Sequence, residues 1–428
     1  MQEFDEIIGY RAVRKGLEKI ADTMRNRETY ARLGVRSPRG LLLYGAPGVG
    51  KTLMANCLIK ASGCHAYTIR KEESGADLIK KINKTFQEAA EHQPAILFLD
   101  DMDKFANVDQ DHCDADEYVT IQSRIDESSQ KDIFILATAN VRGKLPRSLI
   151  RKGRFDRIIE VGLPSEEDAE KIIYSYLSRK GFSGDIDAKI LAEILSGTSC
   201  AELETVVNEA GLLAGYERAG SITMDHLIRA SLESVLDTQS YDEWDLESKE
   251  GEESEISEAA LRQRAYHEAG HIVTAEMVSS GSVKLGMILR DNRKGKGGFI
   301  VTGKAIFEQN WENAAVVRLG GMAGTEQKTG KKDAGAALDL KQAFYMIRNG
   351  MKYTDYLGFH LHSYGYDNSE VLNARQELAV SIEAQKLYQE AKRIIAENMP
   401  FFEALVDELL EKDYILAKDI ARIRKTIA

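Results

Sequence analysis

The chain has 428 residues, which is too long for a single hydrophobic core, and we expect roughly two to four domains. A hydrophobic fraction of 43% and a charged fraction of 29% are typical of a soluble globular protein, whereas the net charge of -11 argues against nucleic acid as a partner. The 4 cysteines form no CxxC pair, which argues against a thiolate zinc site or a disulfide framework and fits a reducing cytoplasm.

Short apolar runs alternate with helical patterns in the first third of the chain, and each run predicts a buried strand. The predicted strands are GLLLY (40–44), HAYTI (65–69), AILFLD (95–100), IFILATA (133–139) and RIIEVGL (157–163). Strands and helices in alternation are typical of a parallel sheet with helices on both faces. We therefore expect an α/β nucleotide-binding subdomain over residues 1–163.

The remainder of the chain predicts mainly helices. Residues 164–236 carry helical periodicity and suggest a small helical lid, and the acidic stretch 237–258 has the composition of a solvated linker. Residues 259–428 predict a second, mainly helical domain with a hairpin over 283–303. No run of 18 apolar residues occurs, so we expect a cytoplasmic chain that meets a membrane only if a longer form carries an N-terminal anchor.

The sequence GAPGVGKT follows the first predicted strand, precedes a helical stretch and fits the pattern G-x-x-x-x-G-K-[ST]. Its glycines let backbone N–H groups surround a polyphosphate, while the lysine reaches the terminal phosphates and the threonine can hold Mg²⁺. We expect the following residues to bind the nucleotide: Gly45, Ala46, Pro47, Gly48, Val49, Gly50, Lys51 and Thr52. The alternative is an ordinary glycine-rich turn, which the flanking strand and helix disfavour.

Two aspartates follow the predicted strand AILFLD, at the edge of the sheet where parallel strands end. We expect Asp100 to contact the Mg²⁺ shell and Asp101 to stand where a carboxylate orients the attacking water. Such a pair alone would more often be a turn or a helix cap. Its combination with the glycine-rich loop favours the catalytic interpretation.

The sequence HEAGH places His267 and His271 one helical turn apart, where they can share one Zn²⁺. Glu268 lies beside the first histidine, where it can deprotonate a water molecule. The alternative is a structural histidine pair. A catalytic zinc usually has three protein ligands, so one is still missing. The residues themselves leave four candidates for it: Glu326, Asp339, His360 and His362.

The first half of the chain resembles the AAA+ ATPases beyond its phosphate-binding motifs. ATAN ends in Asn140, which resembles the polar sensor of the γ-phosphate in that family. LIRKGRFDR resembles the arginine-finger segment, so the resemblance implies that Arg154 and Arg157 reach the ATP of a neighbouring subunit. A finger requires a neighbour, and the family implies a homo-hexamer. Without the resemblance this segment would be a solvated basic turn.

An AAA+ module followed by HExxH is similar to the FtsH-type ATP-dependent zinc metalloproteases. Their third zinc ligand is an aspartate in a D-[IL]-x-Q-A helix, and LDLKQAF matches this pattern, so the resemblance implies Asp339. RLGGMAGTE (318–326) and KYTDYLGF (352–359) also fit the family, and the likeness runs from Phe4 almost to the end. The implied fold is an AAA+ module with a helical lid, followed by a mainly α-helical zinc metallopeptidase domain.

The chain departs from this family in three places. It begins almost at the ATPase module, whereas family members normally carry N-terminal transmembrane helices. The water-orienting glutamate of the family is Asp101 here, which predicts slow ATP hydrolysis. The family's substrate-gripping loop has an aromatic residue, whereas this chain has RKEESGADLIKKIN with Lys71, Glu72 and Glu73. We therefore expect weak unfolding of stable substrates, or a family member with a different loop.

The leading interpretation is an ATP-dependent zinc endopeptidase that acts on protein or peptide substrates and uses Zn²⁺, ATP and Mg²⁺. One alternative is a zinc peptidase with a weak or vestigial ATPase. A second is a nucleotide-switched remodelling protein with an inactive metal site. The complete set of two histidines, a glutamate and an aspartate argues against the second alternative, because a vestigial site has no reason to keep its base.

Overall fold

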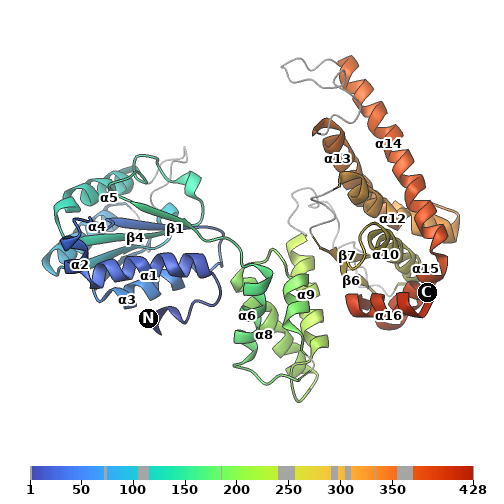
Figure 1. The fold of residues 1–428 in the computed structure, drawn as a ribbon, viewed down its shortest axis with the longest axis horizontal. Coiled ribbons are helices and arrows are strands. Elements are labelled where there is room, and N and C mark those ends of the chain that lie inside the picture. Colours follow the sequence, from blue (N-terminus) through green and yellow to red (C-terminus); the bar gives the residue numbers. More distant parts are fainter. Residues whose placement is uncertain are drawn as a thin grey trace. The chain divides into compact units, whose positions relative to one another are not determined.

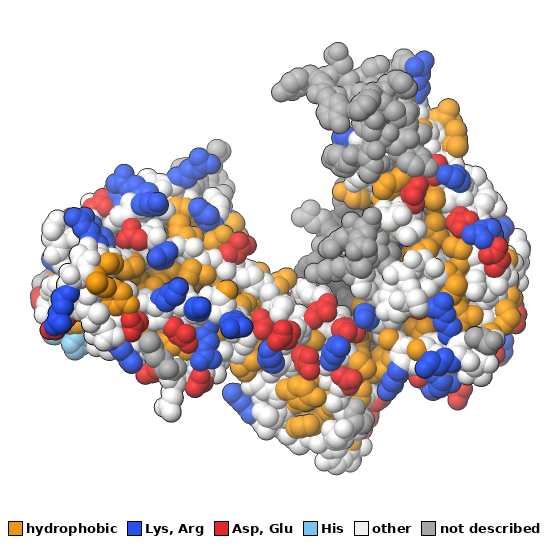
Figure 2. All heavy atoms as spheres, in the orientation of Figure 1, with side chains coloured by type: hydrophobic (Ala, Val, Ile, Leu, Met, Phe, Trp, Pro, Cys, Tyr) orange, Lys and Arg blue, Asp and Glu red, His pale blue; other side chains and the backbone are white. Residues whose placement is uncertain are grey.

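A computed structural model describes residues 2–71, 75–104, 115–184, 186–239, 256–290, 297–303, 310–332, 334–353 and 370–427. The chain divides into two compact units, Met1–Leu236 and Asp237–Ala428 (Figure 1). On the face shown in Figure 2, basic and acidic side chains are interspersed over both units. Among the described residues, no helix is both long enough and apolar enough to cross a membrane.

The first unit is built on a five-stranded parallel sheet. Its strands are β1 (Gly40–Tyr44), β2 (His65–Ile69), β3 (Ala95–Leu99), β4 (Ile133–Ala139) and β5 (Arg157–Glu160). Their order across the sheet is β2-β3-β4-β1-β5, and every neighbouring pair is parallel. The predicted parallel sheet is therefore confirmed, and the only notable difference is that the last strand ends at Glu160 rather than at residue 163.

Helices cover both faces of this sheet. They are α1 (Arg11–Arg25), α3 (Lys51–Ser62), α4 (Ala76–Glu91) and α5 (Ala115–Glu127), and the short α2 (Arg27–Arg32) follows α1 without burying a residue. Leu41 and Leu43 of β1 belong to the core formed with α1 and α3, whereas Leu42 belongs to the core formed with α4 and α5. Successive strand side chains point to opposite faces, and both faces are buried. This is why the three central strands, β1, β3 and β4, have continuous apolar runs, whereas the edge strands β2 and β5 are more exposed.

Four described helices follow the sheet in the segment where we expect the lid: α6 (Glu166–Leu177), α7 (Ala188–Ile194), α8 (Cys200–Tyr216) and α9 (Met224–Gln239). A side-chain cap starts each of the first three, namely Ser165, Asp187 and Ser199. Ser199 forms a complete capping box with Glu202. The Ala201 N–H, one residue into α8, donates to the Gly48 carbonyl at 3.1 Å, so the lid contacts the glycine-rich loop directly.

The second unit is mainly helical. Its elements are α10 (Glu258–Val278), β6 (Val283–Ile288), β7 (Gly298–Thr302), α12 (Trp311–Thr329), α13 (Ala337–Tyr353), α14 (Glu370–Glu397), α15 (Met399–Lys412), β8 (Tyr414–Leu416) and α16 (Ala417–Ile427). The predicted hairpin is present as antiparallel β6 and β7, with β7 at the edge. Strand β8, which pairs with β6, was not predicted, because three residues between two helices give no periodic signal.

Single-turn 3-10 helices complete the described part of the chain. They are η1 (Gln2–Phe4), η2 (Met102–Lys104), η3 (Ser128–Gln130), η4 (Arg142–Lys144) and η6 (Ala334–Ala336). Two of them, η2 and η4, directly follow the residues at the ends of β3 and β4 that the sequence analysis selected. The fold therefore places these residues at one edge of the sheet, as parallel strands require.

Candidate metal centre and nucleotide-binding site

The two histidines of HEAGH lie on one face of α10. The side chain of Ser257 caps this helix by accepting from the Ala260 N–H, and the helix then continues without a break through both histidines. The His267 and His271 rings are 4.7 Å apart between centroids, and their Nε2 atoms are 3.1 Å apart. Helical spacing alone therefore brings two ligand atoms together.

Asp339 supplies a third ligand atom from the first turn of α13. Its Oδ2 lies 3.2 Å from His267 Nε2 and 3.5 Å from His271 Nε2. Bonds of about 2.0–2.1 Å to a tetrahedral zinc ion would separate such atoms by about 3.3 Å. The three side chains therefore fit a zinc ion and leave its fourth position for water or substrate, which is typical of catalytic rather than structural sites.

Neighbouring groups hold two of these ligands in place. His271 Nδ1 lies 2.7 Å from the Val317 carbonyl, so an Nδ1–H donates there and leaves Nε2 with a lone pair for a metal. Burial would raise the pKa of Asp339, but the adjacent His271 and His267 outweigh it and hold that pKa well below its usual range. Asp339 therefore stays ionised, and its Oδ1 faces Arg318 NH1 at 3.6 Å.

Glu268 stands next to this trio in a different environment. Its side chain is buried, and burial raises the pKa of its carboxyl group although His267 and His271 oppose the shift. Its Oε2 has no hydrogen-bond partner among the residues that the structure describes. A buried carboxylate oxygen needs a partner, and a water molecule beside the metal would supply one. These are properties that a general base needs, and the role of Glu268 stays a prediction.

The other candidates for the third ligand have different surroundings or no described position. Glu326 accepts hydrogen bonds from the Tyr388 hydroxyl and from Lys392 Nζ, which links α12 to α14. His360 and His362 lie outside the described residues. Among the residues that the structure describes, His267, His271 and Asp339 form the one group able to hold a metal ion.

The glycine-rich loop connects β1 to α3 in the first unit. Gly48 and Gly50 have φ angles of 78° and 91°, where residues with a side chain are strained. A Cβ on Gly48 would also lie 2.7 Å from Ser199 Oγ of the lid. Lys51 Nζ donates to the carbonyls of Gly45 and Ala46 at 2.8 Å and to Asn140 Oδ1 at 2.9 Å. The loop therefore brings Lys51 and Asn140 together.

Asp100 is the centre of a polar cluster at the end of β3. Its Oδ1 accepts from Thr52 Oγ1 at 3.1 Å and from Thr138 Oγ1 at 2.8 Å, and its Oδ2 accepts from Arg70 Nε at 2.9 Å. Hydroxyl and carboxylate oxygens of this kind surround Mg²⁺ in P-loop proteins. Thr52 and Asp100 were both predicted to lie at the Mg²⁺ site, whereas Thr138 was not, although ATAN places a polar residue inside an apolar strand.

The next two aspartates have different contacts. Asp101 has a φ of 54°, and its Oδ2 accepts from Lys104 Nζ at 2.7 Å. Asp103 is buried, and its Oδ2 accepts from the backbone N–H groups of Asn140 and Val141 at 3.0 and 3.3 Å. Asp103 therefore fixes the backbone at Asn140 and Val141, a contact between distant residues that has no signal in the sequence.

The two arginines of GRFDR differ in exposure. Arg154 is 4% exposed, and it donates to Asp126 through Nε at 2.7 Å and NH2 at 2.5 Å, and to the Ser148 carbonyl through NH1. Arg157 is exposed at the start of β5. Within one chain, Arg154 thus contacts Asp126 of α5 and the backbone of Ser148, whereas Arg157 faces solvent. Their roles toward a neighbouring subunit stay predictions.

The segment between β2 and α4 is described only at its ends. Lys71 Nζ donates to the Lys104 carbonyl at 2.9 Å, and the Gly75 N–H donates to Glu117 Oε1 at 2.7 Å. Glu72 and Glu73 lie outside the described residues. The charged character that we expect for this loop therefore stays a prediction.

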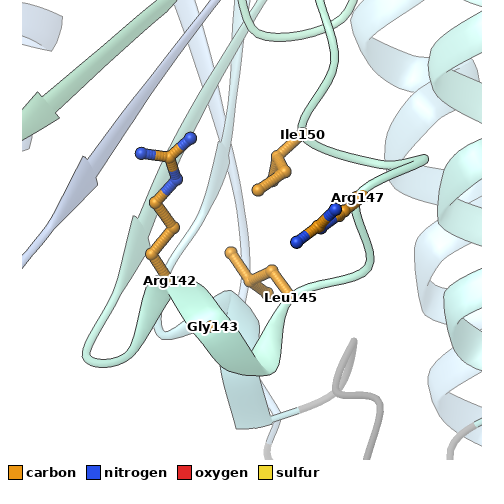
Figure 3. Close-up of a pocket in the computed structure, with 5 residues that line it drawn as sticks. All are labelled: Arg142, Gly143, Leu145, Arg147 and Ile150. Carbon is orange, nitrogen blue, oxygen red and sulfur yellow. The ribbon is translucent and has the colours of Figure 1, made fainter. Parts of the chain in front are cut away.

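A pocket of about 500 Å³ lies in the segment between Asn140 and Arg154 (Figure 3). Arg142, Leu145, Arg147 and Ile150 line it with two guanidinium groups and two aliphatic side chains. The Arg142 guanidinium also lies 5.7 Å from the centre of the Tyr44 ring. The described lining is therefore cationic and aliphatic.

Comparison with known proteins gives two regional matches. Residues 41–163 match the ATPase family associated with various cellular activities (AAA), and residues 254–423 match peptidase family M41. Proteins named ATP-dependent zinc metalloprotease FtsH from Lachnoclostridium phytofermentans, Mycoplasma mobile and Pelobacter propionicus are 27%, 27% and 28% identical to this chain. These alignments cover 98%, 99% and 79% of this chain, which spans 74%, 63% and 55% of the three proteins.

Fold and site together define a P-loop ATPase joined in one chain to a metallopeptidase. The two regional matches and the near full-length relatives support a more specific class, because an AAA region followed by an M41 peptidase region is the arrangement of the FtsH-type AAA zinc metalloproteases, to which this chain is similar over nearly its whole length. The family resemblance, the fold class and the enzyme class predicted from the sequence are therefore confirmed. The predicted cofactors, Zn²⁺ with ATP and Mg²⁺, are those of this family.

Proposed function

We propose that this chain is an ATP-dependent zinc endopeptidase that degrades proteins, and that it works as a homo-hexamer in which ATP hydrolysis is coupled to peptide-bond cleavage. The observation that carries the proposal is the metal centre. Three donor atoms from α10 and α13 lie 3.1–3.5 Å apart, with one buried carboxyl group beside them. A structural metal site would have four ligands and would not need that base.

Each residue of the centre has a defined task in this mechanism. When bound, zinc supplies a Lewis acid that polarises the scissile carbonyl and lowers the pKa of water. Glu268 accepts the proton of the attacking water and delivers it to the leaving amine, for which its burial and raised pKa are suited. The Val317 carbonyl fixes the tautomer of His271, and Asp339 completes the donor set as an anion.

The edge strand β7 is our proposed docking site for the substrate backbone. It begins at Gly298, where an added Cβ would lie 2.8 Å from Glu268 Oε1, so the strand starts at the base. An extended peptide that pairs with this edge gains backbone hydrogen bonds that do not depend on sequence. This mode of binding suits a protease that must accept many substrates.

Proline substitutions along β7 test this docking. Successive backbone N–H groups of a strand point in opposite directions. One of the variants Ile300→Pro and Val301→Pro therefore removes a backbone hydrogen bond to β6. The other removes an N–H group that points outward from the edge and could bind a substrate. We expect the variant that keeps the stability of the unit to lose cleavage of casein. Full cleavage by that variant would exclude docking at this edge.

The polar cluster around Asp100 supports the roles that we propose for the residues of the ATPase half. Lys51 contacts the β- and γ-phosphates, Thr52 and Asp100 hold Mg²⁺, and Asn140 senses the γ-phosphate. Asp101 orients the attacking water, and the arginines at 154 and 157 act on the ATP of a neighbouring subunit. We further propose the boundaries 1–163 for the nucleotide-binding subdomain, 164–236 for the lid, 237–258 for the linker and 259–428 for the protease domain.

One observation supports the alternative of a zinc peptidase with a weak ATPase. Asp101 is one methylene shorter than the family's glutamate, and its carboxylate is held by Lys104 rather than directed freely at a nucleotide. In that case the enzyme would cut flexible chains without unfolding stable ones. Its location, cytoplasmic or at a membrane, does not alter this chemistry.

Casein degradation with and without ATP separates the possibilities, with Glu268→Gln as the control for the metal centre. The leading proposal predicts cleavage that requires ATP and disappears with EDTA or with Glu268→Gln. Cleavage that needs the metal but not ATP would favour the alternative of a zinc peptidase with a weak ATPase. Retained ATP hydrolysis with no cleavage in zinc-loaded protein would exclude the protease and leave a remodelling protein.

A further inference from the structure

Gly321 of α12 lies directly against the metal ligands, which gives the motif RLGGMAGTE a physical meaning. A Cβ built on Gly321 would lie 2.4 Å from His271 Nε2 and 2.5 Å from His267 Nε2. Its next nearest atom is His267 Cδ2 at 2.7 Å. Non-bonded heavy atoms prefer separations of about 3.5–4.0 Å, so even a methyl group has no place here while both imidazoles keep their positions.

A methyl group at this position would crowd the two nitrogen atoms that are proposed to bind the ion. A zinc ion lies about 2.0–2.1 Å from each ligating nitrogen, and the added carbon would stand almost as close to the same two atoms. We propose that Gly321 is a positioning residue of the metal centre, which leaves free the space that His267, His271 and their ion require. This inference rests on the proposed function and deepens it.

Neighbouring glycines of the same helix have a different task. A Cβ on Gly320 would lie 2.3 Å from Thr274 Oγ1 and 2.7 Å from the Gly270 carbonyl oxygen. A Cβ on Gly324 would lie 2.5 Å from the Tyr266 carbonyl oxygen and 3.0 Å from Gly270 Cα. Both positions therefore allow the backbones of α10 and α12 to approach closely.

Gly321 is distinct because the nearest atoms that it would meet are all atoms of the two ligand imidazoles. Gly324→Ala is accordingly a matched control, since it makes the same change on the same helix but presses on the backbone of α10. Any loss caused merely by separating the two helices should appear in both variants. A loss specific to the metal should appear at Gly321 alone.

The first experiment measures metal binding by the purified full chain after EDTA treatment. Zinc affinity is determined by competition with a chromophoric chelator, and Co²⁺ absorption reports the coordination geometry. For Gly321→Ala we expect zinc affinity to fall by on the order of 100-fold and the tetrahedral Co²⁺ spectrum to disappear. Gly324→Ala should keep that spectrum. Wild-type affinity with a tetrahedral spectrum in Gly321→Ala would overturn the proposal.

The second experiment tests the contact without any metal and applies even if Gly321→Ala folds poorly. The loss of thermal stability caused by Gly321→Ala is measured in the wild-type chain and in a His267→Ala, His271→Ala background. Because that background lacks the clashing atoms, the loss should vanish there, as a double-mutant cycle requires of a direct contact. An equal loss in both backgrounds would place the clash elsewhere and overturn the proposal.

These outcomes separate this inference from the proposed protease activity. If wild-type protein binds zinc with a tetrahedral spectrum but cleaves no casein, the protease proposal fails while the role of Gly321 stands. If Gly321→Ala binds zinc like the wild type while wild-type protein cleaves casein, the role of Gly321 fails and the protease proposal stands.

Discussion

Lengthening the carboxylate at position 101 should speed ATP hydrolysis. The Asp101 N–H donates to Thr138 Oγ1 at 2.8 Å, and Thr138 is fully buried, so the backbone at this position is fixed. The side chain alone must then reach the attacking water. A glutamate extends it by about 1.5 Å, the length of one C–C bond. It also moves the carboxylate away from its present contact with Lys104.

The size of the effect follows from the sensitivity of catalysis to distance. A misplacement of about 1 Å can cost about 100-fold in rate, so we expect Asp101→Glu to raise kcat roughly 10- to 100-fold. This corresponds to about 1.4–2.7 kcal/mol of transition-state stabilisation. The KM for ATP should change little, because the nucleotide is bound mainly by the glycine-rich loop and the substitution acts on the chemical step.

Steady-state ATPase assays on the purified chain test this reasoning. Asp103→Glu is the matched control, because the same methylene is added to a buried carboxylate that holds the backbone of Asn140 and Val141. That variant should lose turnover. If Asp101→Glu leaves kcat unchanged or lowers it, carboxylate reach does not limit the reaction and the explanation is wrong.

Three further predictions concern stability, metal removal and pH. Asp126→Ala should lower the free energy of unfolding, measured with a chemical denaturant, by about 2–3 kcal/mol, because it leaves the buried Arg154 guanidinium without two hydrogen bonds. As a control, Asp5→Ala removes an exposed ion pair and should lower it by under about 1 kcal/mol. Saturating zinc at about 100 times Kd should stabilise the second unit by about 2.7 kcal/mol, or about 5–10 °C by calorimetry, and Asp339→Asn should abolish this response. Arg154 lowers the pKa of Asp126, so the pair stabilises the fold above the ordinary aspartate pKa and less as pH falls through the lowered value. The free energy of unfolding of Asp126→Ala should therefore fall less with acid than that of the wild type, and an equal pH dependence in both chains would contradict this.

Local sequence determined what could be predicted about the first unit. A glycine-rich loop between a strand and a helix, and carboxylates at strand ends, are patterns of neighbouring residues, and the parallel sheet then brings them to one edge. The exposure of the arginines could not be predicted in this way. Arg154 is buried because Asp126, 28 residues earlier on α5, folds beside it, and no spacing rule connects the two.

In the metal centre, too, local contacts could be predicted from the sequence and long-range contacts could not. Helical spacing predicts the contact of His267 with His271, but Asp339 lies 72 residues beyond His267 and reaches it only through the packing of α13. Residue type and spacing therefore left four candidates, and only a family resemblance selected one. The Val317 carbonyl, which fixes His271, is a backbone group and gives no sequence signal at all.

Two carboxyl groups share this centre, and their surroundings shift their pKa values in opposite directions. Asp339 lies against two imidazoles, which outweigh its burial and keep it an anion. Glu268 is buried more completely, and there burial outweighs the same imidazoles and raises its pKa. A group that stays ionised suits a metal ligand, whereas one that gains a proton readily suits a base that must later act as an acid. The electrostatics of the fold thus favour the same division of roles that the spacing of HExxH suggests.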